Sequence, residues 1–183
     1  MPRETTTIDL MRHGEPVGGR KYRRQTDDPL SAKGWTQMRE AVGKNCPWHA
    51  LISSPFSRCA DFARELSNSS GLPLEVDDRL AEIKFGTWEG RRPDELTLEK
   101  PDILNQFRID PITYAPEGAE QLSGFQQRVL AGWESVLQSH PSKHVMLITH
   151  AGVIQVMIAH VLQIPLKNIY RIQVPTRVSP VFR

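Results

Sequence analysis

Cysteine is scarce in this 183-residue sequence, which contains only Cys46 and Cys59. Two cysteines are too few for a disulfide framework and match no metal-ligand spacing, so we expect both thiols to be free. Charge of one sign is also scarce, because 23 Lys and Arg residues face 21 Asp and Glu residues and leave a formal net charge of +2. This balance argues against a nucleic acid as a partner of the whole chain, so any anion site is expected to be local.

The sequence also lacks a visible secretory leader and a convincing membrane span. No apolar segment follows the opening Met-Pro-Arg-Glu-Thr-Thr-Thr, so we expect a cytoplasmic protein. The stretch Val145 to Ile164 has the length of a span but is interrupted by polar side chains. We interpret it as a buried strand, His144 to Thr149, then a turn at His150-Ala151-Gly152 and an apolar helix stopped by Pro165. No membrane partner is expected.

Length and composition are typical of one globular domain covering residues 1–183, with 39% apolar and 24% charged residues and no internal repeat. Further strands are predicted over Thr5 to Met11, Ala50 to Ser53 and, more weakly, Leu72 to Val76. Serine caps predict the helix starts, at Ser31, at Ser54 followed by Pro55, and at Ser123. Strands that alternate with helices indicate an α/β fold with helical layers on the sheet.

Two segments have no sustained periodicity. Residues 16–29 form an exposed loop with a basic group at residues 20–24. Residues 91–120 contain four prolines and short helical patterns, which indicate a partly helical cap that shelters a site or, equally, a plain surface insertion. The basic group offers a nucleic-acid contact in principle, although a short basic loop is usually solvated or steers an anionic substrate.

Polar side chains follow three of the predicted strands. Arg12 and His13 come after the first strand, Arg58 lies in the first turn of the helix after the second, and His150 follows the last. Ligands of such sheets bind beyond the carboxyl ends of the strands, so we expect these side chains to converge on one pocket.

This residue set suits a phosphoryl group. Two guanidinium groups match phosphate oxygens, and predicted helix starts at Pro55 and Ala151 would add backbone donors. We assign His13 as the nucleophile, because nearby arginine charge keeps an imidazole neutral, and Glu82 as the proton donor to the leaving group. Taken singly, each position has a plainer structural interpretation, such as a buried histidine or a solvated arginine. A pocket that binds an anion without turnover is the non-enzymatic alternative.

Four motifs resemble those of the histidine phosphatase superfamily and occur in its order. They are Leu10-Met11-Arg12-His13-Gly14-Glu15, Ile52-Ser53-Ser54-Pro55-Phe56-Ser57-Arg58, Glu82-Ile83-Lys84-Phe85-Gly86-Thr87-Trp88-Glu89-Gly90 and Leu147-Ile148-Thr149-His150-Ala151-Gly152. The resemblance implies a phosphohistidine at His13, a phosphoryl group held by Arg12, Arg58 and His150, and Glu82 as the proton donor. It also implies a reaction without metal or other cofactor, and a phosphoglycerate mutase-like three-layer α/β/α fold with a mostly parallel sheet and one antiparallel edge strand.

Within the superfamily, Arg12-His13-Gly14-Glu15-Pro16, followed by Thr26-Asp27-Asp28-Pro29-Leu30-Ser31 and Gly34, is most similar to the α-ribazole phosphatase branch. That similarity implies α-ribazole 5′-phosphate as substrate, in cobalamin biosynthesis. Trp88 or the cap would offer stacking for its aromatic base, although a tryptophan in this position is more often part of the core. Arg24 stands where family members often have glycine, and it either obstructs the phosphate or adds a contact. We assign Arg24, Thr26 and Ala151 to substrate binding.

The sequence does not decide which small-molecule phosphomonoester is the substrate. The alternatives are a phosphoglycerate mutase, or a phosphatase for another sugar phosphate or for protein phosphohistidine. Either a monomer or a homodimer fits the sequence.

Overall fold

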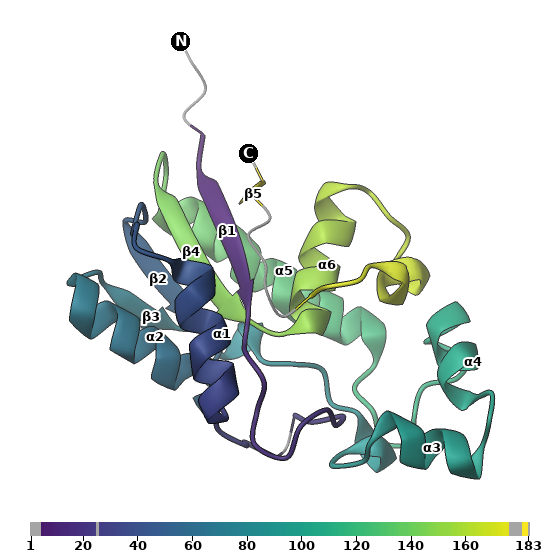
Figure 1. The fold of residues 1–183 in the computed structure, drawn as a ribbon. Helices are drawn as coiled ribbons and strands as arrows, with labels where there is room; N and C mark the ends of the chain where they lie inside the picture. Colours follow the sequence, from purple (N-terminus) through teal and green to yellow (C-terminus); the bar gives the residue numbers. More distant parts are fainter. Residues whose placement is uncertain (1–4, 25, 176–180, 183) are drawn as a thin grey trace.

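The structure of the protein, a computed structural model, describes residues 5–24, 26–175 and 181–182. A central sheet has the strand order β3-β2-β4-β1-β5 (Figure 1). Strands β1 (Thr7–Arg12), β2 (Ala50–Ser53), β3 (Leu74–Val76) and β4 (His144–Thr149) are parallel, and β5 (Val181–Phe182) pairs with β1 antiparallel. The predicted mostly parallel sheet with one antiparallel edge is confirmed. The prediction that the opening residues are not a secretory leader concerns, in part, residues 1–4, which lie outside the described residues.

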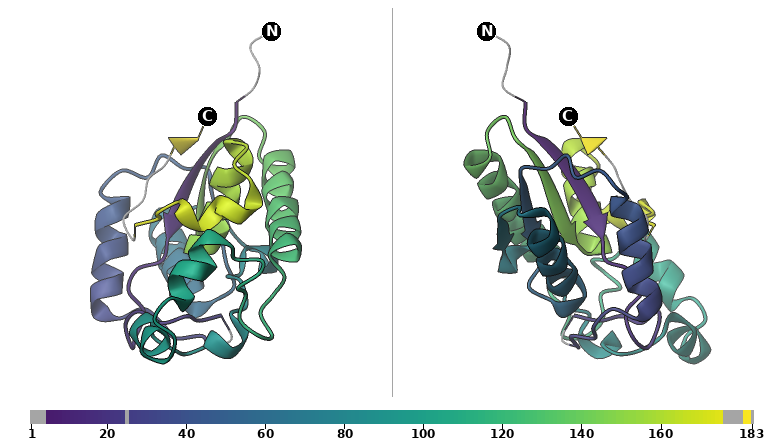
Figure 2. Two further views of the ribbon diagram at one scale, coloured as in Figure 1. Left: turned by 90° about the vertical axis from the view of Figure 1, so that its right-hand side faces the viewer. Right: turned by 60° about the vertical axis from the view of Figure 1, so that its left-hand side comes forward.

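Helices cover both faces of the sheet and complete the predicted three layers. Helices α1 (Ala32–Val42) and α2 (Ser57–Ser70) lie on one face, and α5 (Leu122–Ser139) and α6 (Ala151–Val161) lie on the other (Figures 1 and 2). Consecutive residues of β4 alternate between the two cores. Val145 and Leu147 join the core that contains α5 and α6, whereas Met146 and Ile148 join the core that contains α1 and α2. A strand covered on both faces therefore needs the uninterrupted apolar run seen in the sequence.

The stretch Val145 to Ile164 divides into β4 and α6, as predicted. No helix in the described part of the chain is long and apolar enough to cross a membrane. Two details of the prediction are wrong. The turn assigned to Ala151 and Gly152 is absent, because both residues belong to α6, and α6 ends at Val161, before Pro165. The helix start also predicted at Ala151 is confirmed. His150 is the N-cap residue of this helix, so the strand passes into the helix without a separate turn.

The predicted serine caps have mixed outcomes. Ser31 caps α1 and accepts a hydrogen bond from the Gly34 amide at 3.0 Å. Ser123 lies inside α5, which begins at Leu122 after the N-cap residue Gln121. The helix predicted to begin at Ser54 and Pro55 begins at Ser57, and its N-cap residue, Phe56, has no side-chain acceptor. The sequence alone misplaced these starts because a serine before an apolar pattern has other partners available in the folded chain.

The segment predicted as a cap contains two short helices, α3 (Pro93–Glu99) and α4 (Ile103–Ile109). They share a small aromatic core with Trp88 of η2 (Gly86–Trp88) and with Tyr170 of η3 (Leu166–Arg171). Trp88 is 6% exposed and packs against the rings of Tyr22 and Phe107. The core alternative for Trp88 therefore fits the structure, and the stacking platform does not.

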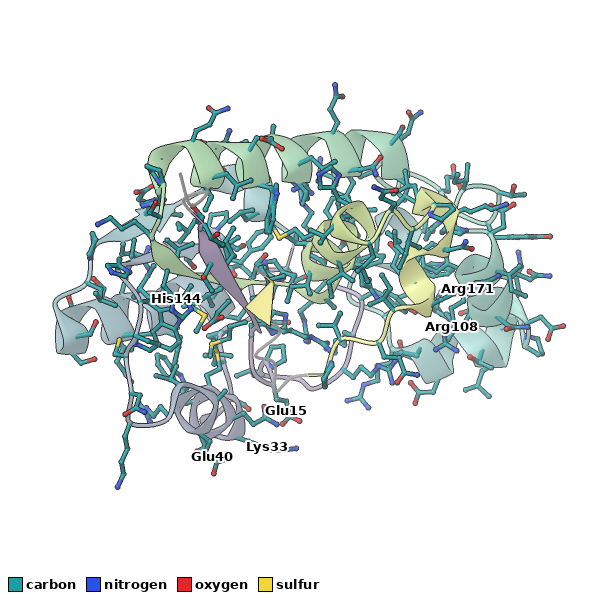
Figure 3. All side chains as sticks on the ribbon, turned by 90° about the horizontal axis from the view of Figure 1, so that it is seen from above. Glu15, Lys33, Glu40, Arg108, His144 and Arg171 are labelled. Atoms are coloured by element: carbon teal, nitrogen blue, oxygen red, sulfur yellow. The ribbon has the colours of Figure 1, made fainter. Side chains whose placement is uncertain are left out.

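The loop after β1 passes very close to the first turn of α1. A Cβ atom on Gly14 would lie 2.2 Å from the Gly34 carbonyl oxygen, and one on Gly34 would lie 2.2 Å from the Glu15 carbonyl oxygen. Because both obstacles are backbone atoms, only glycine fits at either position without a backbone shift. An ion pair between Glu15 and Lys33, 2.9 Å long, spans the same junction on the surface (Figure 3).

Candidate active site

The sheet register brings the ends of three strands together. Arg12 of β1 is paired with Thr149 of β4, and the next amide, that of His13, donates to the Thr149 carbonyl at 3.0 Å. On the other side of β4, the Ser54 amide donates to the Ile148 carbonyl at 3.0 Å. His13, His150 and Ser54 are therefore adjacent because each one follows a neighbouring parallel strand.

Among the described residues, one ring nitrogen of His13 has a hydrogen-bond partner and the other has none. Its Nδ1 lies 2.8 Å from the Gly14 carbonyl oxygen. A carbonyl oxygen only accepts hydrogen bonds, so Nδ1 carries the proton and Nε2 carries the lone pair. The residue is half-buried, and its ring lies edge-on to that of His150 with 5.1 Å between the centroids. This is the tautomer that a nucleophilic Nε2 requires.

Both site histidines are held neutral. Burial, followed by the charge of Arg58, lowers the pKa of His13 to about 3. The same two causes, in the same order, hold the pKa of His150 well below its usual range. Removal from water disfavours the imidazolium form, and a neighbouring cation disfavours it further. His13 is therefore a neutral imidazole at neutral pH, with its proton on Nδ1 and its lone pair on Nε2.

Two arginines provide cationic groups around these rings. Arg58 is fully buried in α2, where its guanidinium lies over the Phe56 ring at 4.8 Å and makes a long 3.4 Å bond to the Arg23 carbonyl. Arg12 donates from Nη1 to the Val174 carbonyl at 2.6 Å. Among the described residues, the buried Arg12 Nε, Arg58 Nε, Arg58 Nη1 and His150 Nδ1 have no hydrogen-bond partner. Buried donors are rarely left unpaired, so this group points to an anionic ligand.

Glu82 reaches the site from the segment that follows β3 and η1 (Asp78–Leu80). Its Oε1 accepts from its neighbour Ile83, at 3.0 Å, and its Oε2 accepts from the Gly152 amide at 3.1 Å. Burial raises the pKa of the Glu82 carboxyl, although the two amide bonds and the charges of Arg58 and Arg12 oppose the shift. A raised pKa favours the protonated acid that a leaving oxygen needs.

A side chain of helix α5 holds the backbone around Glu82 in place. Arg128 of α5 donates to the carbonyls of Arg79, Ala81 and Glu82 at 2.8, 2.7 and 3.1 Å and forms an ion pair with Glu120. Arg128 thus connects the α5 helix to the peptide that carries the carboxyl. Its place in an amphipathic helix gave no sign of this role.

Two further residues at the site were not expected from the sequence. Arg23 is 5% exposed and binds Asp28 and the carbonyls of Gly19 and Val17, which holds the 16–29 loop closed. Asp27 accepts from the Ser57 amide at 2.8 Å and lies 3.8 Å from Arg58 Nη1. Asp27 therefore supplies the cap that α2 lacks locally, and it does so from a distant loop.

One of the predicted free backbone donors at each of the two helix starts is engaged within the protein. The Ser57 amide binds Asp27, and the Gly152 amide binds Glu82. The expectation that both helix ends present open amides to an anion is therefore wrong at these positions. The arginine and histidine donors remain.

The three residues assigned to substrate binding have different surroundings in the structure. The Arg24 amide donates to Glu89 Oε2 at 2.7 Å, and the Arg24 side-chain Nε is buried without a partner in the described part of the chain. Thr26 is exposed, and Ala151 is the half-buried first residue of α6. Their contact with a substrate stays a prediction.

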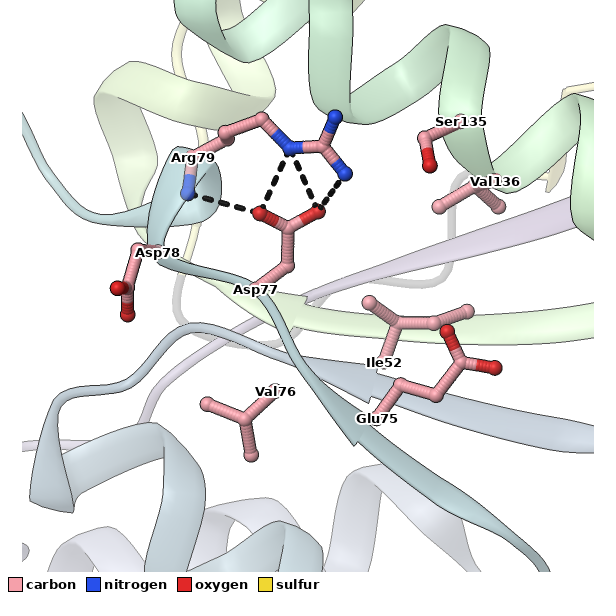
Figure 4. A pocket seen from close by; sticks show the side chains of 8 residues that line it. All are labelled: Ile52, Glu75, Val76, Asp77, Asp78, Arg79, Ser135 and Val136. Atoms are coloured by element: carbon pink, nitrogen blue, oxygen red, sulfur yellow. Dashed lines mark hydrogen bonds and ion pairs between the residues drawn. The ribbon is translucent and has the colours of Figure 1, made fainter.

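A separate hollow lies at the β3 edge of the sheet, between Glu75, Asp77 to Arg79 and the end of α5 (Figure 4). Arg79 binds Asp77 through its Nε and Nη2, with a shortest distance of 2.7 Å. The acidic lining of this hollow does not suit a phosphate. In the described residues, no three His, Cys, Asp or Glu side chains are grouped to hold a metal ion. Cys46 and Cys59 are free, as predicted.

The chain belongs to the histidine phosphatase superfamily, branch 1, whose sequence pattern matches residues 8–180. The bifunctional protein Rv2228c of Mycobacterium tuberculosis is 27% identical over 172 residues, which are 91% of this chain and 47% of that protein. The chain thus spans about half the length of this curated relative. The glucosyl-3-phosphoglycerate phosphatase of M. tuberculosis is 31% identical over 87% of this chain and 76% of its own.

Other relatives are named for different substrates. The adenosylcobalamin/alpha-ribazole phosphatase of Salmonella typhimurium is 25% identical over 90% of this chain and 84% of its own. Among solved structures, mycobacterial glucosyl-3-phosphoglycerate phosphatase in complex with VO3 is 29% identical, with a TM-score of 0.80 over 92% of this chain and 86% of that chain. Bacillus stearothermophilus YhfR also has a TM-score of 0.80, at 28% identity and with the same coverage.

Proposed function

We propose that this protein is a phosphomonoesterase that acts through a phosphohistidine at His13 and needs no metal ion. One observation carries the proposal. The Gly14 carbonyl fixes the Nδ1–H tautomer of a neutral His13, the charges of Arg58 and Arg12 act on its ring, and the ring of His150 lies 5.1 Å away. Nitrogen atoms of Arg12, Arg58 and His150 have no hydrogen-bond partner among the described residues. These cationic and neutral donors supply the charge stabilisation that phosphoryl transfer requires.

The reaction proceeds in two displacements. Nε2 of His13 attacks phosphorus, the ester P–O bond breaks, and the protonated Glu82 carboxyl gives its proton to the leaving oxygen. Water then attacks the phosphohistidine and gives a proton to the Glu82 carboxylate, which releases inorganic phosphate and restores both groups. The structure of mycobacterial glucosyl-3-phosphoglycerate phosphatase, which has a similar fold, is a complex with VO3, an oxyanion that resembles phosphate, and this supports a phosphoryl substrate for the present protein.

Rapid-quench labelling with a ³²P-phosphomonoester tests this assignment. We expect acid-labile label on His13 in the presence of EDTA, and its loss in His13→Ala. His49→Ala removes an exposed histidine outside the site and serves as the matched control. Hydrolysis by His13→Ala at the parental rate, or label on another residue, would reject the proposed nucleophile.

For the substrate, we place α-ribazole 5′-phosphate first, on the motif similarity to that branch and the Salmonella relative. The second candidate is a phosphoglycerate-type ester, favoured by the 31% identity to glucosyl-3-phosphoglycerate phosphatase and by the Arg24 Nε, which has no hydrogen-bond partner among the described residues. Arg108 of α4 and Arg171 of η3 add positive charge at the cap end of the molecule (Figure 3). Values of kcat/KM for both esters and for 3-phosphoglycerate, measured with EDTA present, decide between the two candidates and the mutase alternative.

A further inference from the structure

Ser54 connects two of the strand ends that build the site. It follows β2, is 0% exposed, and its hydroxyl oxygen lies 2.7 Å from Nε2 of His150, which follows β4. His150 is also 0% exposed. The bond joins residues 96 positions apart in the chain, and it is the contact that Ser54 makes in place of the helix cap expected from the sequence.

His150 has two nitrogens with different tasks. Nε2 faces Ser54, so Nδ1 is the nitrogen left for an anion, and it is buried without a partner among the described residues. A neutral imidazole has one N–H donor and one lone pair. To bind a phosphoryl oxygen, the neutral ring has to carry its proton on Nδ1, because a lone pair facing the anion would repel it. Nε2 is then an acceptor and needs a donor.

Besides Nε2 of His150, the Ser54 side chain contacts Cys59 Sγ, but a neutral thiol is only a weak acceptor, so the imidazole nitrogen is the better acceptor of the serine proton. The Phe56 amide points at the serine oxygen at 3.5 Å, on the acceptor side of the hydroxyl. Cys59 Sγ is the other candidate donor to Nε2, at 3.8 Å, but its thiol is a weak donor that also lies 3.6 Å from the Thr149 carbonyl oxygen. The serine hydroxyl is the stronger and closer donor.

We propose that Ser54 is a positioning residue, which donates its hydroxyl proton to Nε2 of His150 and thereby holds the Nδ1–H tautomer that binds the phosphoryl group. The kinetic side of this inference rests on the proposed function. The tautomer itself is a property of the free protein and is measurable without any substrate.

The direct test is ¹⁵N NMR of the histidine rings in the full-length protein. We expect His150 of the parent to show a protonated Nδ1 and an unprotonated Nε2, and Ser54→Ala to show a mixture of tautomers. Ser53→Ala is the matched control, because Ser53 is equally buried but its hydroxyl bonds the Ser54 carbonyl and not the ring. A parent protein in which Nε2 carries the proton overturns the proposal even if no variant folds.

The second test is the binding of inorganic vanadate together with steady-state kinetics. Loss of a hydrogen bond that keeps a buried donor in its binding form weakens binding by about 10-fold to 100-fold. We therefore expect Ser54→Ala to lower vanadate affinity and kcat/KM by that factor. We expect Ser54→Cys, which keeps a weak donor, to recover part of the loss, and Ser53→Ala to change both quantities less than about 2-fold.

These outcomes separate the two proposals. If the parent forms no phosphohistidine, the proposed function fails while the tautomer result still stands. If the parent is labelled but Ser54→Ala keeps the Nδ1–H tautomer and the parental kcat/KM, the role of Ser54 is rejected and the function is retained.

Discussion

The Gly152 amide donates to one oxygen of Glu82, and the absence of a side chain at position 152 makes room for the other. A Cβ atom on Gly152 would lie 2.3 Å from Glu82 Oε1 and 3.4 Å from the Phe125 ring. The obstacle is the end of a flexible side chain, so the carboxyl would move before the backbone did. The start of α6 thus determines where the proposed acid sits.

We expect Gly152→Ala to displace the Glu82 carboxyl and to lower kcat by about 100-fold for esters with alkyl leaving groups, the lower end of the usual contribution of a general acid. An aryl phosphate, whose leaving group needs little protonation, should lose much less. The measurement is kcat for an alkyl and an aryl ester side by side. Gly124→Ala in α5, where a Cβ meets nothing within 4 Å, is the control. Equal losses on both esters would show that Glu82 is not the acid.

The two neutral histidines make stability sensitive to acid. The pKa of His13 is about 3 in the folded chain and near 6.5 when unfolded, so below about pH 6.5 the unfolded state binds the proton first. Folding stability should therefore fall as the pH drops from about 6.5 towards 3, by at most about 1.4 kcal/mol per pH unit for each such histidine, and then level off for His13.

Urea unfolding of the parent and of His13→Gln, at several pH values, measures this effect as a difference between the two proteins. We expect the parent to lose stability relative to the variant below about pH 6.5. Glu82 acts in the opposite direction, because its raised pKa gives stability below the unfolded value that is lost as the pH rises. A parent–variant difference that does not change between pH 4 and 6.5 would contradict a neutral, buried His13.

Asp27 should stabilise α2 from outside the helix. Asp27→Ala removes the acceptor of the Ser57 amide and hydroxyl, so we expect the free energy of unfolding to fall by about 1 kcal/mol, as for loss of an N-cap. Asp61→Ala breaks an exposed ion pair with Arg64 in the same helix and should cost less than about 0.5 kcal/mol. Similar losses in both variants would reject the capping role.

Arg24 is the residue through which substrate choice is most directly tested. The Arg24 Nε has no hydrogen-bond partner in the described part of the chain. If it binds a second anionic group, Arg24→Ala should raise KM for a phosphoglycerate-type ester by about 10-fold and leave KM for an aryl phosphate within about 2-fold. Lys21→Ala removes an equal charge from the same loop and is the control. A uniform rise in KM across substrates would assign Arg24 to the phosphoryl group instead.

The sequence was most informative where position along a strand decides position in space. Arg12, His13 and His150 follow parallel neighbours, so their proximity needs only the sheet order and register. Contacts that depend on how a loop or helix turns its side chains were not predictable. Asp27 reaches Ser57 across a loop, and Ser54 turns its hydroxyl to a histidine instead of a helix. The sequence Ser54-Pro55 is the same whether the serine caps a helix or bonds a distant histidine, so it does not distinguish the two.

The aromatic core around Trp88, Leu96 and Phe107 is separate from the two cores of the sheet, although Phe85 and Tyr170 contact it and the larger core. The residues of the proposed phosphoryl site lie at strand ends and in the first turn of α2, whereas α3 and α4 pack around an aromatic core of their own. We therefore expect substitutions within that core to leave His13, Arg12 and Arg58 in place. Evolution can then vary α3 and α4 more freely than the strand ends.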